Sequence, residues 1–278
     1  MSSVMLTRSI PSTGEEIPII GFGTWQGFDV RPDGSSLDQR MEVLRILLNS
    51  GGTVIDSSPM YGRAEEVAGR ALVQLKSDVR PFLATKVWTR GRKAGIRQME
   101  ESFRLLGNDV IDLMQIHNLV DWRTHLPVLR EWKDQGRIRY IGITHYTNSG
   151  LDRLCEAMTE EFFDFVQCCY AINARAAEDQ LLPMAAERGV AVMANKPFGQ
   201  GGLFSSIRRH PLPDWCDEFD CTSWAQYFLK YIVSHPAITT VIPGTSRIES
   251  ANDNVMAGFG CLPDPDLRNR MAEYWSTL

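Results

Sequence analysis

The chain has 278 residues, of which 44% are hydrophobic and 23% charged, and it carries a formal net charge of −5. This composition is typical of a soluble globular protein with a sizeable core, and it excludes a disordered or fibrous chain. The negative charge argues against a nucleic acid or an anionic membrane as the main partner. The first residues show no secretory signal pattern and no apolar run approaches membrane-spanning length, so we expect a cytoplasmic protein.

The elements begin with residues 6–20, where Ser12, Thr13 and Gly14 separate two short β-prone pieces. This pattern predicts a β-hairpin, which we expect to plug one end of a barrel. Residues 19–24 then predict the first barrel strand. Seven further strands are predicted at residues 53–57, 82–87, 111–116, 140–144, 165–168, 191–195 and 239–242.

Helical periodicity follows each of these strands. The predicted helices cover residues 38–50, 65–75, 96–106, 125–135, 150–158, 177–188, 223–234 and 248–257. Eight alternating strand–helix units are typical of a closed parallel barrel, so the sequence predicts the α/β class, a (β/α)8 TIM barrel, as a single domain over residues 1–278. A final helix against the barrel wall is expected within residues 264–278. The long connection at residues 198–222 starts with three glycines and predicts a mobile lid.

The six cysteines have neither CxxC nor metal-ligand spacing. Cys168 and Cys169 are neighbours on a predicted strand, so their side chains point to opposite faces and a disulfide between them is not expected. We therefore expect reduced thiols and no metal site.

Four polar side chains stand at or just after the ends of consecutive predicted strands, namely Asp56, Tyr61, Lys86 and His117. The carboxyl ends of barrel strands are where barrel enzymes build their active sites. Each residue also has an ordinary interpretation: a helix cap, a rim aromatic, a solvated lysine and a hydrogen-bonded core histidine. Their shared position at successive strand ends favours a common site.

At these residues the sequence resembles the aldo-keto reductase superfamily, in its bacterial-type members. The matching pieces run in family order over about nine-tenths of the chain. They are residues 21–25, 55–56 with 61–62, 65–72, 85–88, 112–117, 136–142 and 242–247.

The resemblance implies the reduction of an aldehyde or ketone to an alcohol, or the reverse oxidation. A nicotinamide supplies the hydride, and Tyr61 gives its proton to the carbonyl oxygen. Lys86, paired with Asp56, is expected to lower the pKa of Tyr61, and His117 to orient the carbonyl oxygen.

The cofactor is not expected at a Rossmann turn, because no GxGxxG motif opens a helix after a strand. The segment after the last strand brings backbone N–H groups and a guanidinium to a helix start, which indicates an anion site. By resemblance it holds the 2′-phosphate of NADPH, with Asp253 and Asn254 near the adenine. The segment comprises Gly244, Thr245, Ser246 and Arg247.

Some relatives carry a lysine and a further arginine where this chain has Gly244 and Ser250. Arg247 is then the sole side chain expected on the phosphate, so the preference for NADPH over NADH is predicted to be modest.

The nicotinamide carboxamide is expected to bind Thr144, His145 and Gln167, where relatives carry Ser, Asn and Gln. Asn195 stands where relatives place an aromatic that stacks on the ring, which predicts weaker cofactor binding. The remaining contacts implied by the resemblance are Thr24, Trp25, Asp56, Lys196, Phe198, Gly199 and Gly201.

Aromatic and apolar residues near the strand ends predict an apolar substrate pocket formed by Trp25, Met60, Trp88 and Trp122, with Phe204 as a further candidate. Such a pocket suits aldehydes, ketones, and aryl or steroid-like substrates. For Trp122 and Phe204 an ordinary rim position is an equally simple interpretation.

Two other functions fit the same residues. One is a Schiff-base aldolase with Lys86 as nucleophile, although an ion pair with Asp56 works against it. The other is a cofactor-binding redox sensor or regulatory subunit. The sequence shows no exposed apolar helix stripe, so we expect a monomer whose partner is a small carbonyl compound, with no nucleic acid or membrane partner.

Overall fold

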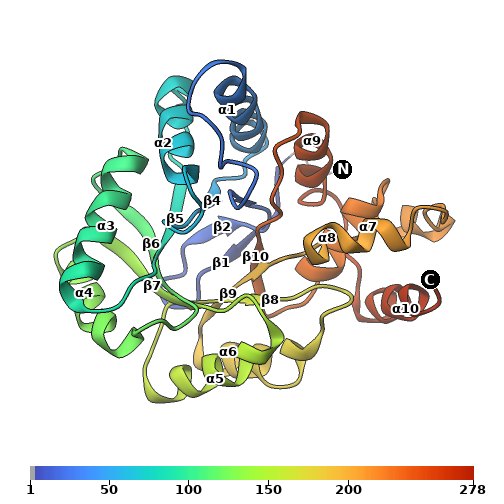
Figure 1. The fold of residues 1–278 in the computed structure, drawn as a ribbon. Helices are drawn as coiled ribbons and strands as arrows, with labels where there is room; N and C mark the ends of the chain where they lie inside the picture. The colour runs from blue at the N-terminus through green and yellow to red at the C-terminus, as the bar shows by residue number, and fades with distance from the viewer. Residues whose placement is uncertain (1–3) are drawn as a thin grey trace.

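The computed structural model describes residues 4–278 as a barrel of parallel strands surrounded by helices (Figure 1). Eight strands pair in sequence order within the described residues, so each new strand is added beside the previous one. The strands are β3 (Phe22–Gly23), β4 (Val54–Asp56), β5 (Phe82–Val87), β6 (Ile111–His117), β7 (Ile138–Thr144), β8 (Phe165–Cys169), β9 (Ala191–Asn195) and β10 (Ile238–Val241). This confirms the predicted (β/α)8 barrel.

The barrel closes where the first and last strands meet. Two isolated parallel bridges join them, Ile20 with Val241 and Gly23 with Gly244. Backbone N–H groups of Gly21 and Gly23 donate to the carbonyls of Val241 and Pro243 at 2.9 and 3.0 Å. The short β3 therefore completes the ring.

Helices cover the outside of the barrel in the order expected for a (β/α)8 chain. They are α1 (Gly34–Asn49), α2 (Ala64–Leu75), α3 (Arg92–Leu106), α4 (Trp122–Asp134), α5 (Leu151–Glu160), α6 (Leu181–Arg188), α8 (Trp224–Val233) and α9 (Ile248–Met256). The last helix, α10 (Pro265–Ser276), lies where it was predicted, and Asp264 caps it by accepting from the N–H of Leu267 at 2.9 Å. None of the helices described is both long and apolar enough to cross a bilayer.

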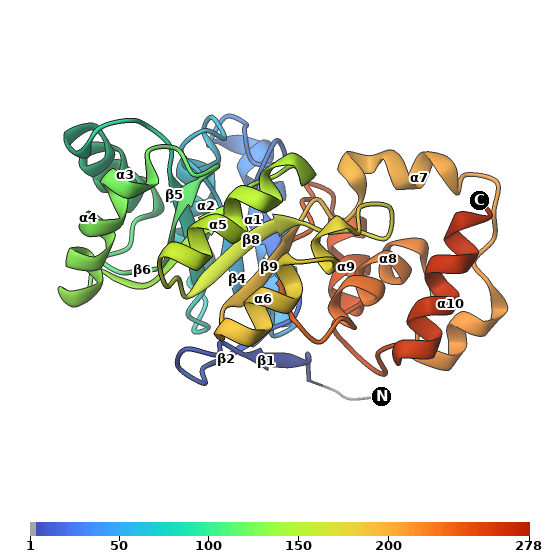
Figure 2. The same ribbon diagram turned by 90° about the horizontal axis from the view of Figure 1, so that it is seen from below.

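An N-terminal hairpin lies across one end of the barrel, below the strands in Figure 2. It consists of β1 (Thr7–Ser9) and β2 (Glu16–Pro18), which pair antiparallel. Ile10 and Ile17 from this hairpin join the interior barrel cluster that contains Phe82, Tyr140 and Phe165. The predicted hairpin plug is therefore present.

The interior cluster follows from the alternation of side chains along each strand. Every second residue points inward, and near the hairpin these residues are large and apolar, with the rings of Phe82 and Tyr140 stacked at 5.9 Å. Toward the opposite end the inward positions become polar. The same alternation of side chains that builds the core thus points the polar residues into the barrel interior at its opposite end.

Two predicted elements differ in the structure. The helix predicted at residues 177–188 is divided into the 3-10 turn η2 (Ala176–Glu178) and α6. Pro183 has no N–H to donate within a helix, so it is tolerated in the first turn of α6 and the helix starts just before it.

The segment at residues 198–222 contains more regular secondary structure than predicted. It contains η3 (Gly199–Gly201), α7 (Gly202–Ser206) and η4 (Asp214–Phe219). Leu203 and Phe219 are buried, and Phe204 packs against Phe198 and Phe228 with ring centroids 5.0 and 5.9 Å apart. These apolar side chains anchor the segment against α8.

Candidate active site

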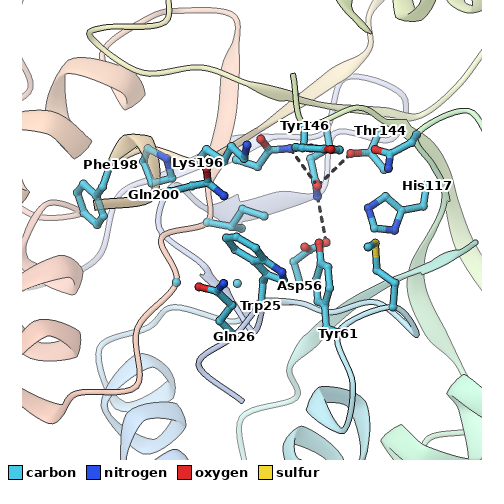
Figure 3. A pocket seen from close by; sticks show the side chains of 18 of the residues that line it. Trp25, Gln26, Asp56, Tyr61, His117, Thr144, Tyr146, Lys196, Phe198 and Gln200 are labelled. Carbon is cyan, nitrogen blue, oxygen red and sulfur yellow. Dashed lines mark hydrogen bonds between the residues drawn. The ribbon is translucent and has the colours of Figure 1, made fainter. Parts of the chain in front are cut away.

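The polar inward positions meet at the carboxyl ends of the strands, where they form the floor of a cavity (Figure 3). The strands β4 to β9 each contribute at least one of these side chains. They are Asp56, Lys86, Gln115 with His117, Thr144, Gln167 and Asn195; all of them line the cavity except Lys86 and Gln115, which are fully buried.

A buried ion pair lies at the centre of this floor. Nζ of Lys86 is 2.6 Å from Oδ2 of Asp56, and it also donates to the carbonyl oxygen of Ser57 at 2.7 Å. Burial lowers the pKa of Lys86, but Asp56 and Tyr61 together outweigh this effect and the net pKa lies above its ordinary value. Lys86 is therefore an ammonium at neutral pH.

The second oxygen of Asp56 is held by two amides. Nε2 of Gln115 and Nε2 of Gln167 each donate to Oδ1 at 3.0 Å. The backbone N–H and the hydroxyl of Thr24 donate to the carbonyl oxygen of Asp56, at 2.9 and 3.1 Å. Thr24 thus supports the strand end that carries Asp56, a role different from the cofactor contact expected of it.

Tyr61 lies beside the ion pair, on the cavity side. The ammonium of Lys86 is 5.2 Å from the centroid of its ring, and the ring of His117 packs edge-on against it at 5.9 Å. Burial raises the pKa of Tyr61 above its ordinary value, while the charge of Lys86 acts in the opposite direction. The expectation of a lowered pKa is wrong here, because the loss of water around the phenol outweighs the nearby cation.

His117 is neutral in this environment. Burial, together with the charges of Lys86 and His145, lowers its pKa to about 2. Its Nδ1 lies 3.0 Å from the hydroxyl of Ser58, a buried residue that the sequence did not single out.

The cavity above this floor has a volume of about 760 Å3. Of the predicted substrate residues, Trp25, Met60, Trp88 and Phe204 line it. Trp122 does not: it is buried at the start of α4, with its ring 6.1 Å from that of Phe163. The prediction of Trp122 as a substrate contact is therefore corrected to a core position.

The polar edge of the cavity is built around Gln167. Its Oε1 accepts from Oγ1 of Thr144 at 3.1 Å and from Nδ2 of Asn195 at 3.3 Å. Oδ1 of Asn195 is buried and has no hydrogen-bond partner among the described residues. Amide and hydroxyl groups therefore converge on one patch of the cavity wall.

His145 is not part of this wall. Its Nδ1 accepts from the N–H of Thr147 at 3.3 Å, and its ring packs so tightly on Gly150 that a Cβ there would lie 2.1 Å away. Tyr146 lines the cavity instead, with the ammonium of Lys196 4.5 Å from its ring centroid. The prediction of His145 as a carboxamide contact is corrected, because the turn after β7 places its ring against Gly150 and not in the cavity wall.

Some of the residues predicted for the rest of the cofactor lie at the cavity and others beyond its edge. Lys196, Phe198, Gly201 and Gly244 line the cavity, whereas Gly199 lies in the turn between them. Beyond Gly244, residues Thr245, Ser246 and Arg247 lead into α9, and the Arg247 side chain is 74% exposed.

Asp253 and Asn254, the residues expected near the adenine, do not line the cavity. The Asp253 carboxylate accepts from the hydroxyl of Ser223 at 2.8 Å and from Nε2 of Gln226 at 2.7 Å, so it holds the start of α8. Asn254 is buried. The carboxylate of Asp253 is thus already engaged within the protein.

Several lining residues were not predicted from the sequence. Gln26, Asn118 and Gln200 have positive φ values of 57°, 54° and 58°, and such turns follow from tertiary packing more than from local sequence. Gln115, a buried partner of Asp56 that the sequence predictions also missed, carried a signal, because it lies on β6 two residues before the inward-facing His117. Tyr146 lies beyond the end of β7, so strand alternation gave no signal for it.

The fold and the site define a barrel enzyme whose polar residues converge at the carboxyl ends of its strands. The model of the aldo/keto reductase family matches residues 19–269, and the chain belongs to this family. It is therefore an NAD(P)H-dependent oxidoreductase that acts on carbonyl groups.

Relatives and solved structures agree with this assignment. The chain is 28% identical to methylglyoxal reductase YeaE of Escherichia coli (strain K12) over 258 residues, covering 90% of this chain and 89% of the relative. It is also 28% identical to the NADH-specific methylglyoxal reductase of the same organism. This alignment spans 330 residues including gaps and covers 96% of this chain and 98% of the relative. An aldo-keto reductase from Klebsiella pneumoniae in complex with NADPH superposes with a TM-score of 0.79 at 25% identity, covering 98% and 96%.

Proposed function

We propose that this protein reduces an aldehyde or ketone to an alcohol with NADPH, and that Tyr61 supplies the proton. The observation that carries the proposal is the buried ion pair of Lys86 and Asp56, which lies directly beside Tyr61 and His117 at the floor of the cavity.

The cavity suits a nicotinamide cofactor. The orphaned Oδ1 of Asn195 lies beside Thr144 and Gln167, and together these groups can bind a carboxamide. Gly244 continues the wall toward the exposed Arg247, whose guanidinium can pair with a phosphate. When bound there, the cofactor supplies the hydride that a carbonyl carbon accepts.

The protein residues have separate tasks in this proposal. The Tyr61 hydroxyl donates its proton to the carbonyl oxygen, and the Lys86 ammonium stabilises the phenolate that remains. Asp56 holds Lys86 in place and keeps it charged. Neutral His117 donates a hydrogen bond to the same carbonyl oxygen. Trp25 and Trp88 exclude water from the substrate.

The substrate class follows from the cavity wall and the relatives. Trp25, Met60, Trp88 and Phe204 present apolar surfaces to the cavity, and Trp88 lies beside His117 with ring centroids 6.4 Å apart. Tyr61 and His117 face the same cavity (Figure 3). Two relatives are named as methylglyoxal reductases. We propose that small 2-oxoaldehydes are substrates and that aryl aldehydes also fit.

The preference between NADPH and NADH depends in this proposal on Arg247. The names of the compared proteins include both an NADH-specific enzyme and a complex with NADPH. With one exposed guanidinium at the phosphate position, a modest preference for NADPH is expected.

The geometry argues against the aldolase function. A Schiff-base lysine must lose its proton, but Lys86 is fully buried against Asp56 and its pKa is raised. The ion pair therefore favours the reductase.

We further propose that the chain functions as a single-domain monomer in the cytoplasm. The cavity is lined by strand ends and loops of the one barrel, from Gly23 to Gly244, which supports a single domain. All six cysteines are free, which suits a reducing compartment.

Fluorescence titration with NADPH and NADH tests the proposal, because Trp25 and Trp88 lie in the cavity wall. The same samples are then assayed with methylglyoxal, aryl aldehydes, diketones and ketosteroids. NADPH binding with turnover is expected. Tight binding without turnover of any carbonyl would favour the redox-sensor alternative, and a lack of binding would refute the cofactor site.

A further inference from the structure

Ser58 is a buried residue that contacts His117 behind the candidate active site. It follows β4 by two residues, its side chain is fully buried, and its Oγ lies 3.0 Å from Nδ1 of His117. Neither the sequence motifs nor the family comparison assigns it a role.

The direction of this hydrogen bond can be argued from the neighbouring groups. The backbone N–H of Met60 donates to Oγ of Ser58 at 3.3 Å, so this oxygen already serves as an acceptor. The hydroxyl proton then needs an acceptor of its own, and Nδ1 of His117 is the one that the described structure offers. A buried donor left without a partner costs about 1–3 kcal/mol, so the hydroxyl donates to Nδ1.

This direction fixes the proton on the imidazole. The environment lowers the pKa of His117 to about 2, so the ring is neutral and carries a single proton. Because Nδ1 accepts, the proton resides on Nε2. Nε2 has no hydrogen-bond partner in the described part of the chain, and His117 lines the cavity, so this N–H is free to meet a ligand (Figure 3).

The backbone of Ser58 also contributes to the site. Its carbonyl oxygen accepts from the N–H of Tyr61 at 3.0 Å, which closes the turn that carries the tyrosine. One residue therefore contacts both the proposed proton donor, through its backbone, and the imidazole, through its side chain. A substitution by alanine removes the second contact and keeps the first.

We propose that Ser58 is a positioning residue for carbonyl reduction: its hydroxyl holds His117 as the Nε2–H tautomer and directs that N–H at the carbonyl oxygen. The inference rests on the proposed function for its catalytic consequence. The tautomer and the ring orientation are properties of the protein alone, so they can be tested without substrate.

The first test is a nitrogen-15 NMR spectrum of the imidazole side chains at neutral pH, without ligand. The chain has five histidines, and the His117 signals are assigned by comparison with His117→Gln. In the wild type we expect an unprotonated, hydrogen-bonded Nδ1 and a protonated Nε2. A proton on Nδ1 of His117 would overturn the proposal.

The second test compares Ser58→Ala with Ser58→Thr, which keeps a hydroxyl. Ser58→Ala is expected to shift the Nδ1 resonance of His117 and to lower kcat about 10-fold or more, because a misdirected donor no longer meets the carbonyl oxygen. The dissociation constant for NADPH should stay within about twofold. Ser58→Thr should retain the wild-type Nδ1 signal and most of kcat.

Ser102→Ala serves as the matched control, since Ser102 is also fully buried but lies in α3, where its hydroxyl donates to the carbonyl of Gln98. It should leave the His117 resonances unchanged. An unchanged His117 spectrum and kcat in Ser58→Ala would sink the proposal. If the wild type reduced no carbonyl compound, the function would fail while the spectra still decided the tautomer.

Discussion

Nζ of Lys86 lies 2.6 Å from Oδ2 of Asp56, and neither side chain has appreciable contact with solvent. Removing one partner from such a pair leaves the other as an uncompensated buried charge. We expect Lys86→Met to abolish activity and to reduce the free energy of unfolding by about 3–5 kcal/mol, measured by urea denaturation.

A control for this change is Arg104→Met. Arg104 pairs with Glu101 at 2.5 Å, but both side chains are largely exposed. Such surface pairs contribute little, so the unfolding curve should move by less than about 1 kcal/mol. Equal effects of the two substitutions would show that the buried position of the Lys86 pair has no special importance.

Tyr61→Phe removes the phenolic hydroxyl and little else. The ring still packs against His117 and beneath the Lys86 ammonium, so the cavity keeps its shape. We expect carbonyl reduction to fall by at least about 100-fold, the lower range for a general acid, with NADPH binding nearly intact. Stopped-flow assays and fluorescence titration measure the two quantities. Loss of NADPH affinity in this variant would refute Tyr61 as simply the proton donor.

Arg247→Ala should separate the two cofactors. The Arg247 guanidinium is exposed beside the start of α9, so only a ligand that carries a phosphate at this position can use it. We expect NADPH to bind about 10-fold more weakly, while NADH changes by less than about twofold. Titration of the exposed Arg270→Ala variant provides the control. Equal weakening of both cofactors would place the phosphate elsewhere.

His117 predicts a specific pH dependence of stability. Its pKa is about 2 in the folded protein, against an ordinary value of 6.5. Below pH 6.5 the unfolded chain binds a proton at this residue and the folded chain does not. The contribution of neutral His117 to the free energy of unfolding is therefore fully present above pH 6.5, and it is lost as the pH falls toward 2.

The comparison of wild type with His117→Gln isolates this effect, since all other titrating groups are shared. Between pH 6.5 and pH 4.5 the wild type should lose up to about 1.4 kcal/mol more per pH unit than the variant. Denaturation at several pH values gives the two slopes. Parallel curves would mean that His117 keeps an ordinary pKa.

Much of the fold could be predicted because barrel strands leave a simple signature. The inward positions of β4, β5 and β6 alternate with a period of two, and this parity alone directs Asp56, Lys86 and His117 into one space. The hairpin was predictable from its turn residues, and its two buried isoleucines explain why it covers the barrel end.

The parts that could not be predicted lie beyond the strand ends. The alternation of side chains stops where the strand stops, so the packing of the His145 ring on Gly150 depends on the turn after β7. Trp88 directly follows β5, whereas Trp122 comes after a turn beyond β6 and the first turn of α4 directs it against Phe163. Loop dihedral angles, set by packing between distant segments, decide these cases.

The joint between β3 and β10 has a consequence for ligand binding. Gly23 and Gly244 form one of the two bridges of this joint, and both residues also line the cavity. A molecule that rests against them contacts the first and the last strand at once, so its binding free energy adds to the work needed to separate the two ends of the chain. Amide exchange at Gly21, Gly23 and Val241 should therefore slow as a larger fraction of the protein binds ligand in the cavity. The exchange rates at this joint would then report how much of the cavity is occupied.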